Sequence, residues 1–172
     1  MSGIYREWGP VYRGLGLEPR PIAPGGKACK LKGWQNPMSE AAIATSLEAH
    51  GHCGIGLVTG TLLADGTHLV ALDIDHDAYT RLGWVLVREP ACARIGKKGV
   101  AIFCRSRQLL SSEVFKLPGL LRGAFGNPAE ILAAKKLVVI PPTIHPDTGQ
   151  PYRWIGKPLH EIGPEQLPLI EV

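Results

Sequence analysis

The sequence predicts a single α+β domain over residues 1–172, in which helices flank a mixed or antiparallel sheet. Three stretches carry apolar residues at helical spacing. Most of the remaining chain consists of short β-prone runs bounded by glycine or proline, and its 21 glycines and 15 prolines indicate many turns. A chain of 172 residues, 45% of them hydrophobic, is long enough to bury a core of its own.

Charge and cysteine usage narrow the classes of function. The formal net charge of +4 permits a partner that carries phosphates without requiring one. The four cysteines are scattered with no CxxC spacing, so we expect reduced thiols and no zinc. No apolar run approaches the roughly 20 residues that a membrane helix needs. These features predict a cytoplasmic protein with no membrane contact.

The first fifty residues predict two helices joined by a basic, proline-rich segment. Apolar spacing favours a helix over residues 3–17. Prolines confine any strand near residues 21–23 to the edge of a sheet. A second helix is expected over residues 39–50, with Ser39 as its N-cap and Gly51 at its end.

Three lysines and one tryptophan lie close together in the segment between these helices. A basic loop with an aromatic residue suits contact with a phosphate backbone and a stacked base. The alternative is a solvated lysine loop whose tryptophan is anchored in the core. The four residues are Lys27, Lys30, Lys32 and Trp34.

The next part of the chain predicts two strands and a helix. Residues 54–60 form a strand that enters a glycine turn, and a hairpin at residues 64–66 returns the chain as a strand over residues 68–77. The glycine spacing and the hairpin exclude a dinucleotide-binding βαβ unit. A helix is expected over residues 78–88. Its inward face is predicted to carry Leu82, Val85 and Leu86.

Two aspartates near the end of the second strand are candidates for a metal site. Side chains alternate along a strand, so Asp73 and Asp75 share one face at a spacing of about 6.6 Å. Two carboxylates so placed can share one or two divalent cations. The alternative is an ordinary solvated strand end, and Asp77 is expected to cap the following helix. The aspartate face also carries Leu69 and Ala71, whereas Val70, Leu72 and Ile74 share the other face.

A basic turn follows the predicted helix. Residues 93–105 predict two strands around a tight turn at residues 96–99. The spacing is not that of a P-loop. Three cations beside a glycine turn nevertheless suit a triphosphate, and the alternative is an exposed basic hairpin tip. The cations are Arg94, Lys97 and Lys98.

The C-terminal third predicts short strands and one isolated acid. Glu130 is the only acid in a predicted hairpin and lies on an otherwise apolar strand, where it needs a partner. A metal shared with Asp73 and Asp75 would provide one, and so would a lysine or arginine. The expected strands are residues 114–117, 129–132, 136–140 and 152–154, with the hairpin turn at residues 133–135 and a further short turn at residues 164–167.

A proline-rich loop over residues 141–151 is expected to be rigid. Such a loop can present Thr143 and His145 at fixed positions, which makes both candidates for contact with a nucleotide. A lone histidine is more often structural than functional, so His145 has both interpretations.

The order of these motifs along the chain is itself informative. They are Pro24-Gly-Gly-Lys27 with Lys32-Gly-Trp34, Ile55-Gly-Leu-Val-Thr-Gly60, Leu72-Asp-Ile-Asp75, Glu130-Ile-Leu132 and the loop over residues 141–154. Together they resemble the primase-polymerase domain at the N-terminus of phage and plasmid replication proteins. That domain belongs to the archaeo-eukaryotic primase superfamily. Each motif is short, but the ordered set covers most of the chain.

The resemblance implies a two-lobed primase-polymerase fold whose RRM-like sheet carries the acids. It also implies a nucleotidyltransferase that adds dNTPs or NTPs on a single-stranded DNA template, through two Mg²⁺ or Mn²⁺ ions. Asp73 and Asp75 fall on the first acidic pair of the family, and Glu130 falls where a third acid is expected. These three would be the catalytic metal ligands. A helicase or an accessory priming domain usually follows such a domain.

The remaining candidates divide between the two substrates in this hypothesis. The template backbone would follow Lys27, Lys30, Lys32 and Trp34, and the contact should be salt-sensitive. The triphosphate would be held by Arg94, Lys97 and Lys98, with Thr143 and His145 as further candidates.

One position departs from the family pattern. Where much of the superfamily has a histidine that contacts the incoming nucleotide, this chain has Ala101. Either Arg94 and Lys98 bind the triphosphate instead, or the domain has lost part of its activity. The alternative function is therefore a catalytically impaired module that binds nucleotides and single-stranded DNA. A metal-dependent nuclease is a third possibility, because paired acids also serve hydrolysis.

Overall fold

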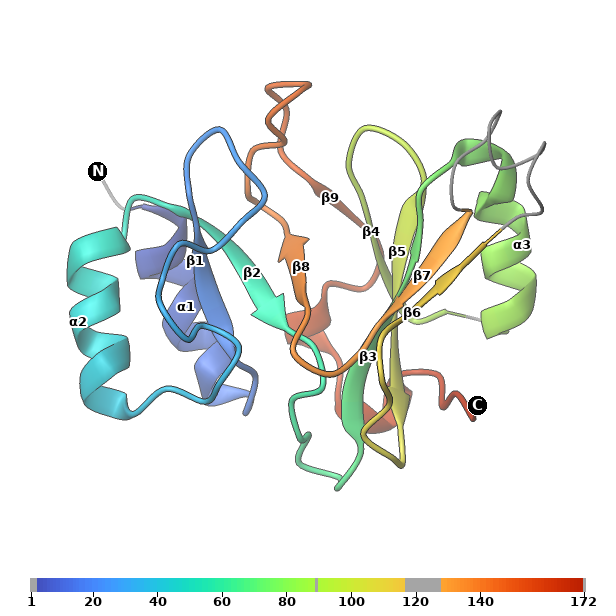
Figure 1. Cartoon of the computed structure of the whole chain (residues 1–172), viewed down its shortest axis with the longest axis horizontal. Coiled ribbons are helices and arrows are strands. Elements are labelled where there is room, and N and C mark those ends of the chain that lie inside the picture. The colour runs from blue at the N-terminus through green and yellow to red at the C-terminus, as the bar shows by residue number, and fades with distance from the viewer. Residues whose placement is uncertain (1–2, 89, 117–127, 172) are drawn as a thin grey trace.

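The computed structural model describes residues 3–88, 90–116 and 128–171, which form two lobes side by side (Figure 1). The smaller lobe contains α1 (Ile4–Gly14), β1 (Pro19–Ile22), α2 (Glu40–His50), β2 (Gly54–Val58) and β8 (Leu137–Ile140). The larger lobe contains β3 (His68–Ile74), α3 (Asp77–Val87), β4 (Cys92–Ile95), β5 (Val100–Ser106), β6 (Glu113–Phe115), β7 (Ala129–Leu132) and β9 (Arg153–Gly156). Two short 3₁₀ turns, η1 (Leu159–Glu161) and η2 (Pro164–Gln166), follow.

Each lobe is built on its own antiparallel sheet. The smaller lobe has three strands in the order β1-β2-β8, and the larger lobe has six in the order β6-β7-β3-β5-β4-β9. In Figure 1, α1 lies against β1 and β2 with α2 beside it at the left of the molecule, and α3 packs on β3 and β5 of the large sheet. The predicted α+β fold with two lobes and flanking helices is therefore confirmed.

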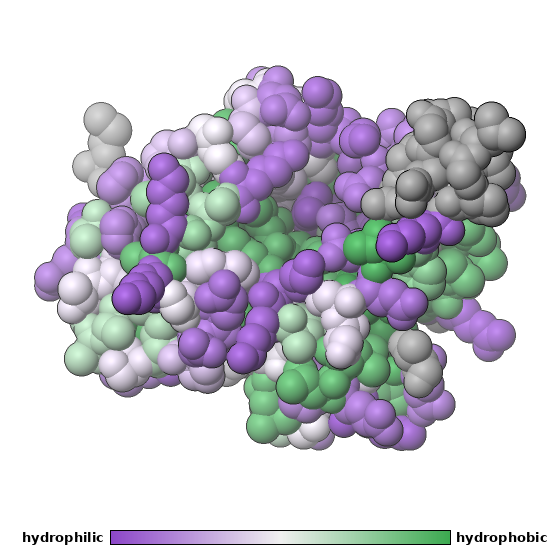
Figure 2. All heavy atoms as spheres, viewed as in Figure 1, coloured by the Kyte–Doolittle hydropathy of each residue, from purple (hydrophilic) through white to green (hydrophobic). Residues whose placement is uncertain are grey.

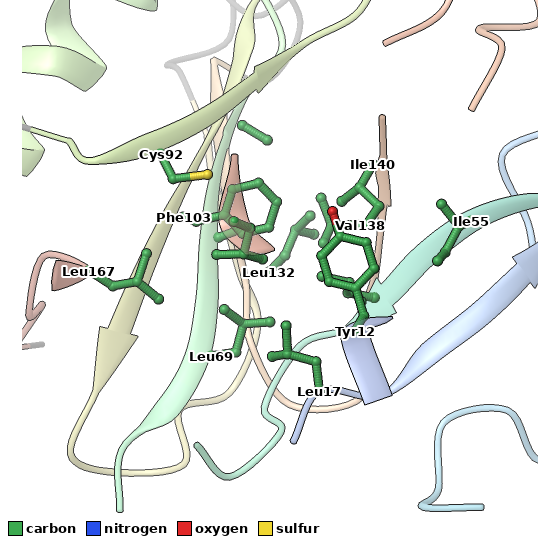
Figure 3. Close-up of a cluster of buried hydrophobic side chains, with 14 of the residues drawn as sticks. Tyr12, Leu17, Ile55, Leu69, Cys92, Phe103, Leu132, Val138, Ile140 and Leu167 are labelled. Carbon is green, nitrogen blue, oxygen red and sulfur yellow. The ribbon is translucent and has the colours of Figure 1, made fainter. Parts of the chain in front are cut away.

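The main hydrophobic core lies between the two sheets and joins the lobes. Side chains from β2 and β8 of the smaller lobe meet side chains from β3, β5 and β7 of the larger one, and α1 closes the cluster (Figure 3). Burying this shared apolar surface is what holds the lobes against each other. Its members include Tyr12, Ile55, Val138, Ile140, Leu69, Phe103 and Leu132.

A second cluster fills the opposite face of the large sheet, beneath α3. The alternation predicted for β3 is confirmed by this division: Leu69 and Ala71 belong to the main core. The other face contributes Val70, Leu72 and Ile74 to the second cluster. The acids that follow on the first face are consequently aimed at the space between the lobes.

The hairpin turn predicted at residues 64–66 is confirmed, because an antiparallel bridge closes it. The main strands on either side of the two predicted hairpin turns nevertheless do not pair with each other, because the chain changes sheets between them. β2 and β3 lie in different sheets, and so do β7 and β8. At the first crossing the Thr59 N–H donates to the Lys136 carbonyl (2.9 Å), while the Gly60 N–H donates to the Leu69 carbonyl (2.7 Å). Gly60 has a φ of +81°, and a Cβ there would lie 2.8 Å from the Ala134 Cα, so glycine is needed where the two crossings pass.

The predicted orientation of α3 is also wrong. The helix buries Gly83 and Val87. Gly83 allows close packing on the sheet, since a Cβ there would lie 3.1 Å from the Ile74 Cγ1. With the helix in this orientation, Trp84 packs on the cluster beneath it and three aliphatic side chains point outward. The exposed residues, with their exposed fractions, are Leu82 (52%), Val85 (67%) and Leu86 (65%).

Several other local predictions are confirmed. β1 is an edge strand that tolerates its prolines, and Ser39 caps α2 by accepting the Ala42 N–H at 3.3 Å. The strand expected at residues 114–117 is β6, and residue 117 lies outside the described part of the chain. All four cysteines are buried free thiols. None of the helices that the structure describes has the length and the apolar run needed to cross a bilayer.

Asp65 stabilises the turn that leads into β3, and the loss of stability caused by replacing it with asparagine should depend on pH. It accepts hydrogen bonds from Thr67 (2.6 and 3.0 Å) and from the Arg105 Nη1 (2.5 Å). Burial acts to raise the pKa of Asp65, but the bonds from Thr67 and Arg105 outweigh it and lower the pKa below its usual 3.8. We expect Asp65→Asn to lower the free energy of unfolding by about 1 kcal/mol at neutral pH.

The effect should fade in acid, which urea denaturation at several pH values would measure. A lowered native pKa gives stability that is present above the unfolded-state pKa and is lost as the pH falls through the native one. The difference between wild type and Asp65→Asn should therefore shrink below pH 3.8. An equal difference at neutral and acid pH would contradict the assignment.

Candidate active site

Four neighbouring strands of the large sheet bring one row of residues to the face that looks toward the smaller lobe. Arg94 of β4 lies opposite Ala101 of β5, Ala101 lies opposite Asp73 of β3, and Asp73 lies opposite Glu130 of β7. Directly opposed residues share a face of a sheet. Residues that are far apart in the sequence are thus aligned across the strands.

A cleft of about 450 Å³ opens between the lobes beside this row, and we call it the interlobe cleft. Its walls come from the end of β3, the β4–β5 turn, β8, the loop before β9 and one lysine of the smaller lobe. In Figure 2, hydrophilic side chains gather at the upper end of the molecule, over the β4–β5 turn and that loop. The cleft is lined by Lys27, Asp73, Asp75, Arg94, Lys97, Lys98, Leu132, Leu137, Val139, His145, Asp147 and Tyr152.

Asp73 lies beside two other acids, and its carboxyl is harder to ionise than usual. Burial raises the pKa of its carboxyl, and the nearby acids Asp75 and Glu130 raise it further. Arg94 opposes this rise, with its Nη2 at 3.5 Å from the Asp73 Oδ1, and Lys27 opposes it more weakly. The net shift is upward, so these two cations do not offset burial and the neighbouring acids together. A further cation at this place would favour the ionised carboxylate.

Glu130 is expected to need either a metal ion or a basic side chain as its partner, and the structure places a lysine there. Its Oε1 forms an ion pair with the Lys136 Nζ at 3.0 Å. As the side chains stand, the structure places no group of three or more His, Cys, Asp or Glu residues at metal-binding positions within its described ranges. The carboxylates of Asp73, Asp75 and Glu130 are nevertheless hard oxygen donors of the kind that Mg²⁺ and Mn²⁺ prefer. The raised pKa of Asp73 fits this donor set.

Arg94 spans the cleft from the acids to an aromatic ring. Its guanidinium lies near Asp73 and also stacks over the ring of Tyr152, at 5.0 Å from the ring centroid. Ala101, which has no exposed surface, is the small residue beneath this path. The Arg94 Nε is buried and has no hydrogen-bond partner among the described residues. A buried donor with no acceptor favours an anionic ligand.

Tyr152 is a site residue that the sequence reasoning missed. It is 3% exposed, and its ring contacts the His145 ring with the centroids 5.0 Å apart. Gly96 makes room for both rings, because a Cβ there would lie 2.6 Å from the Tyr152 Cε1 and 2.9 Å from the His145 Cδ2. The only sequence signal was an aromatic residue beside the final strand, and it does not reveal these partners.

His145 is buried and faces several cations. Burial lowers its pKa, Lys27 lowers it further, and Asp147 partly opposes them. The His145 Nδ1 accepts the Asp147 N–H at 3.1 Å. The neutral ring therefore carries its proton on Nε2, where it is available as a donor. The loop is also tied to the basic turn through Lys97 and Asp147, whose charged atoms are 3.5 Å apart.

Five predicted site residues are not among those that line the interlobe cleft. One is Glu130, which lies beside Asp73 on β7. Thr143 is buried, and its hydroxyl bonds the backbone N–H (2.6 Å) and carbonyl (2.9 Å) of Ile55, which makes its role structural. Lys30 is exposed on the loop of the smaller lobe. Lys32 and Trp34 line a separate groove beside α2.

Asp77 has a different role from the predicted helix cap, which was wrong. His76 is the N-cap of α3, and its Nδ1 accepts the Ala78 N–H at 3.1 Å. Asp77 instead accepts the backbone N–H of Gly99 at 2.6 Å. This bond fixes the basic β4–β5 turn to the start of the helix.

Replacing Gly99 by alanine should destabilise the protein strongly. Gly99 has a φ of +61°, and a Cβ there would overlap the carbonyl oxygen of Ile74. We expect the free energy of unfolding to fall by about 3 kcal/mol, measured by urea denaturation. The matched control is Gly66→Ala, at φ +81° with nothing within 4 Å of its Cβ, which should lose only about 1 kcal/mol. Equal losses would show that the Ile74 contact is relaxed.

A cleft between two antiparallel sheets that is lined by both carboxylates and cations suits a protein that binds metal ions and nucleotides. Comparison with protein families makes this specific, because the family of bifunctional DNA primase/polymerase N-terminal domains (Prim-Pol) matches residues 11–169. The chain belongs to this family, and the resemblance drawn from its motifs is confirmed. Family membership supports primase- and polymerase-type nucleotidyl transfer in general. A comparison with curated proteins gave no match.

Proposed function

We propose that this domain catalyses template-directed nucleotidyl transfer, as a DNA primase or DNA polymerase in the replication of a phage, plasmid or mobile element. The observation that carries the proposal is the interlobe cleft itself. It combines a half-buried carboxylate of raised pKa on β3 with a wall of cations on the β4–β5 turn. The carboxylate side suits divalent cations and the basic side suits a triphosphate.

The acids would hold the metal ions. Asp73, Asp75 and Glu130 supply the carboxylates, and two Mg²⁺ or Mn²⁺ ions bound there would activate the attacking hydroxyl and offset charge on the leaving pyrophosphate. To bind a metal ion, Glu130 would have to release its ion pair with Lys136. Glu130 lies directly opposite Asp73 on the neighbouring strand, which supports its assignment to the same group.

The basic wall would bind and orient the nucleotide. Arg94 offers a guanidinium with a free buried Nε donor, and Lys97 and Lys98 add charge from the turn. Tyr152 packs against Arg94, and His145 packs against Tyr152. The guanidinium charge is therefore oriented in advance, and such preorganised charges stabilise the charge that develops during transfer reactions. The apolar part of the wall suits the sugar and base of the same nucleotide. It consists of Leu132, Leu137 and Val139.

Incorporation of labelled dNTPs or NTPs on a single-stranded template, in the presence of Mg²⁺ or Mn²⁺, tests this function. Extension that depends on the template would support it. Binding of template and nucleotide without extension would favour a non-catalytic module. That second candidate draws on one observation: a buried alanine, Ala101, occupies the centre of the row where the superfamily pattern has a histidine. Loss of labelled DNA without extension would instead indicate a nuclease.

A further inference from the structure

The smaller lobe carries a second hollow, of about 460 Å³, which we call the α2 groove. One wall is the loop that follows the basic segment, and the other is a single face of α2. Positions 42, 45, 46, 49 and 50 repeat at helical spacing along that face. No carboxylate is present among the lining residues, which are Leu31, Lys32, Gly33, Trp34, Pro37, Met38, Ser39, Ala42, Thr45, Ser46, Ala49 and His50.

Trp34 is the unusual member of this groove. The other three tryptophans pack against hydrophobic cores: Trp8 and Trp154 against the main core, and Trp84 against the cluster beneath α3. Trp34 is half-buried and belongs to none of the hydrophobic clusters formed by the described residues. The alternative expectation for Trp34, a ring anchored in the core, is therefore wrong.

The backbone of Trp34 is held rigidly although its ring is not packed in a core. Arg20 has no exposed surface, and it donates from Nε to the Trp34 carbonyl (2.7 Å) and from Nη2 to the Asn36 carbonyl (2.7 Å). Glu18 balances its charge at 2.9 Å. A buried arginine is costly unless it is fully bonded, so this network makes the loop a fixed platform.

A line of cations connects the α2 groove to the interlobe cleft. Lys27 lines the cleft and Lys32 lines the groove, and Lys30, between them in the sequence, is exposed. The seven residue steps from Lys27 to Trp34 span at most about 25 Å even when fully extended. A single nucleic-acid strand that enters the cleft can therefore follow these lysines to the groove.

The floor of the groove is closed by buried hydroxyl groups. Ser46 lines the groove and is 4% exposed. Its hydroxyl lies near enough to the Tyr5 hydroxyl to oppose the rise in the Tyr5 pKa that burial causes. Because both oxygens are shielded from solvent, the floor contributes shape, and contact with a ligand would come from the walls.

We propose that the α2 groove binds one unpaired base of the single-stranded template, stacked on Trp34, next to the position that is being copied. Stacking accepts any base, because every base has a π-face, and the lysine line supplies sequence-independent contact with the phosphates. The base being copied pairs with the incoming nucleotide in the interlobe cleft, so the base in the groove is a different one. This proposal rests on the proposed function, because only a polymerase would bring the copied base of the same strand into the interlobe cleft.

Binding of a fluorescent oligothymidylate to the whole chain, in EDTA and without nucleotides, tests this site separately from catalysis. Trp34→Ala should weaken binding by roughly 5- to 100-fold, the range for loss of one stacked base, whereas Trp34→Phe should retain most of the affinity. Ala49→Leu, which fills the groove, should also weaken binding several-fold. Its matched control is Ala44→Leu on an exposed part of α2 outside the groove, which should bind as wild type does.

Two further measurements identify the ligand chemistry. The double variant Lys30→Ala with Lys32→Ala should have a weaker salt dependence of binding. The slope of log K against log salt concentration should become less negative by about 0.7 for each lysine removed. An oligonucleotide with abasic sites keeps the phosphates but removes the stacking partner, so Trp34→Ala should make no difference to its affinity.

Equal oligothymidylate affinity for wild type, Trp34→Ala and Ala49→Leu would overturn the proposal, and so would the absence of binding by the wild type. Either result leaves the incorporation assay to judge the proposed function on its own. Conversely, loss of affinity in the groove variants together with a wild type that never extends a primer would keep the groove and reject the polymerase.

Discussion

Asp73→Asn is expected to lower template-directed incorporation by on the order of 10³-fold or more, with no loss of folding stability. The amide keeps the size of the carboxyl group and its ability to accept from Arg94, but removes the negative charge that would hold a divalent cation. Native Asp73 has a raised pKa because of burial and because of Asp75 and Glu130. A group with a raised native pKa destabilises the fold above that pKa, so removing its charge should leave the unfolding midpoint equal or higher.

The combination of lost activity and retained stability separates a site residue from a structural one. Asp65→Asn is the matched control, since its pKa is lowered by hydrogen bonds and it lies in the turn before β3, outside the interlobe cleft. That variant should lose stability and keep incorporation. Incorporation by Asp73→Asn at the wild-type rate, measured by primer extension with labelled nucleotides, would remove Asp73 from the mechanism. Asp75→Asn should behave as Asp73→Asn does.

The sequence predicted the local structure of the acidic strand because alternation is a local property. The faces of β3 followed from a period of two, and the β4–β5 turn followed from glycines that flank basic residues. The same reasoning failed where the outcome depends on distant contacts. Nothing local tells a chain to leave one sheet and join another, so β2 with β3, and β7 with β8, were paired wrongly.

The phase of α3 shows the same limit at the scale of one helix. Hydrophobic spacing favoured burying its large side chains, but Gly83 allows the helix backbone to approach the sheet, and in that orientation Leu82, Val85 and Leu86 point outward. In the site, the acids were predictable as residue types with a known chemistry. Tyr152 was not, because its function depends on Arg94 and His145, which come from other segments.

Arg94→Ala should raise the KM for the incoming nucleotide by roughly 10- to 100-fold, the loss expected for a charge-assisted hydrogen bond, with a smaller change in kcat. Its buried Nε has no partner among the described residues, and the guanidinium lies over the Tyr152 ring, so the side chain is oriented before the nucleotide arrives. Arg94→Lys should recover only part of the loss, because an ammonium cannot reproduce the planar stacking or the fork of donors. Steady-state kinetics with varied nucleotide concentration measure both variants.

Arg153→Ala is the control for the removal of charge from this edge of the sheet. Arg153 is exposed on β9, next to the strand that carries Arg94, and does not line the interlobe cleft. Its KM should remain that of the wild type. A large fall in kcat with an unchanged KM for Arg94→Ala would instead assign the guanidinium to the reacting atoms or to the acids. Because Arg94 reaches Asp73 across Ala101, an unchanged KM would also mean that no cation has replaced the histidine of the superfamily pattern at this position.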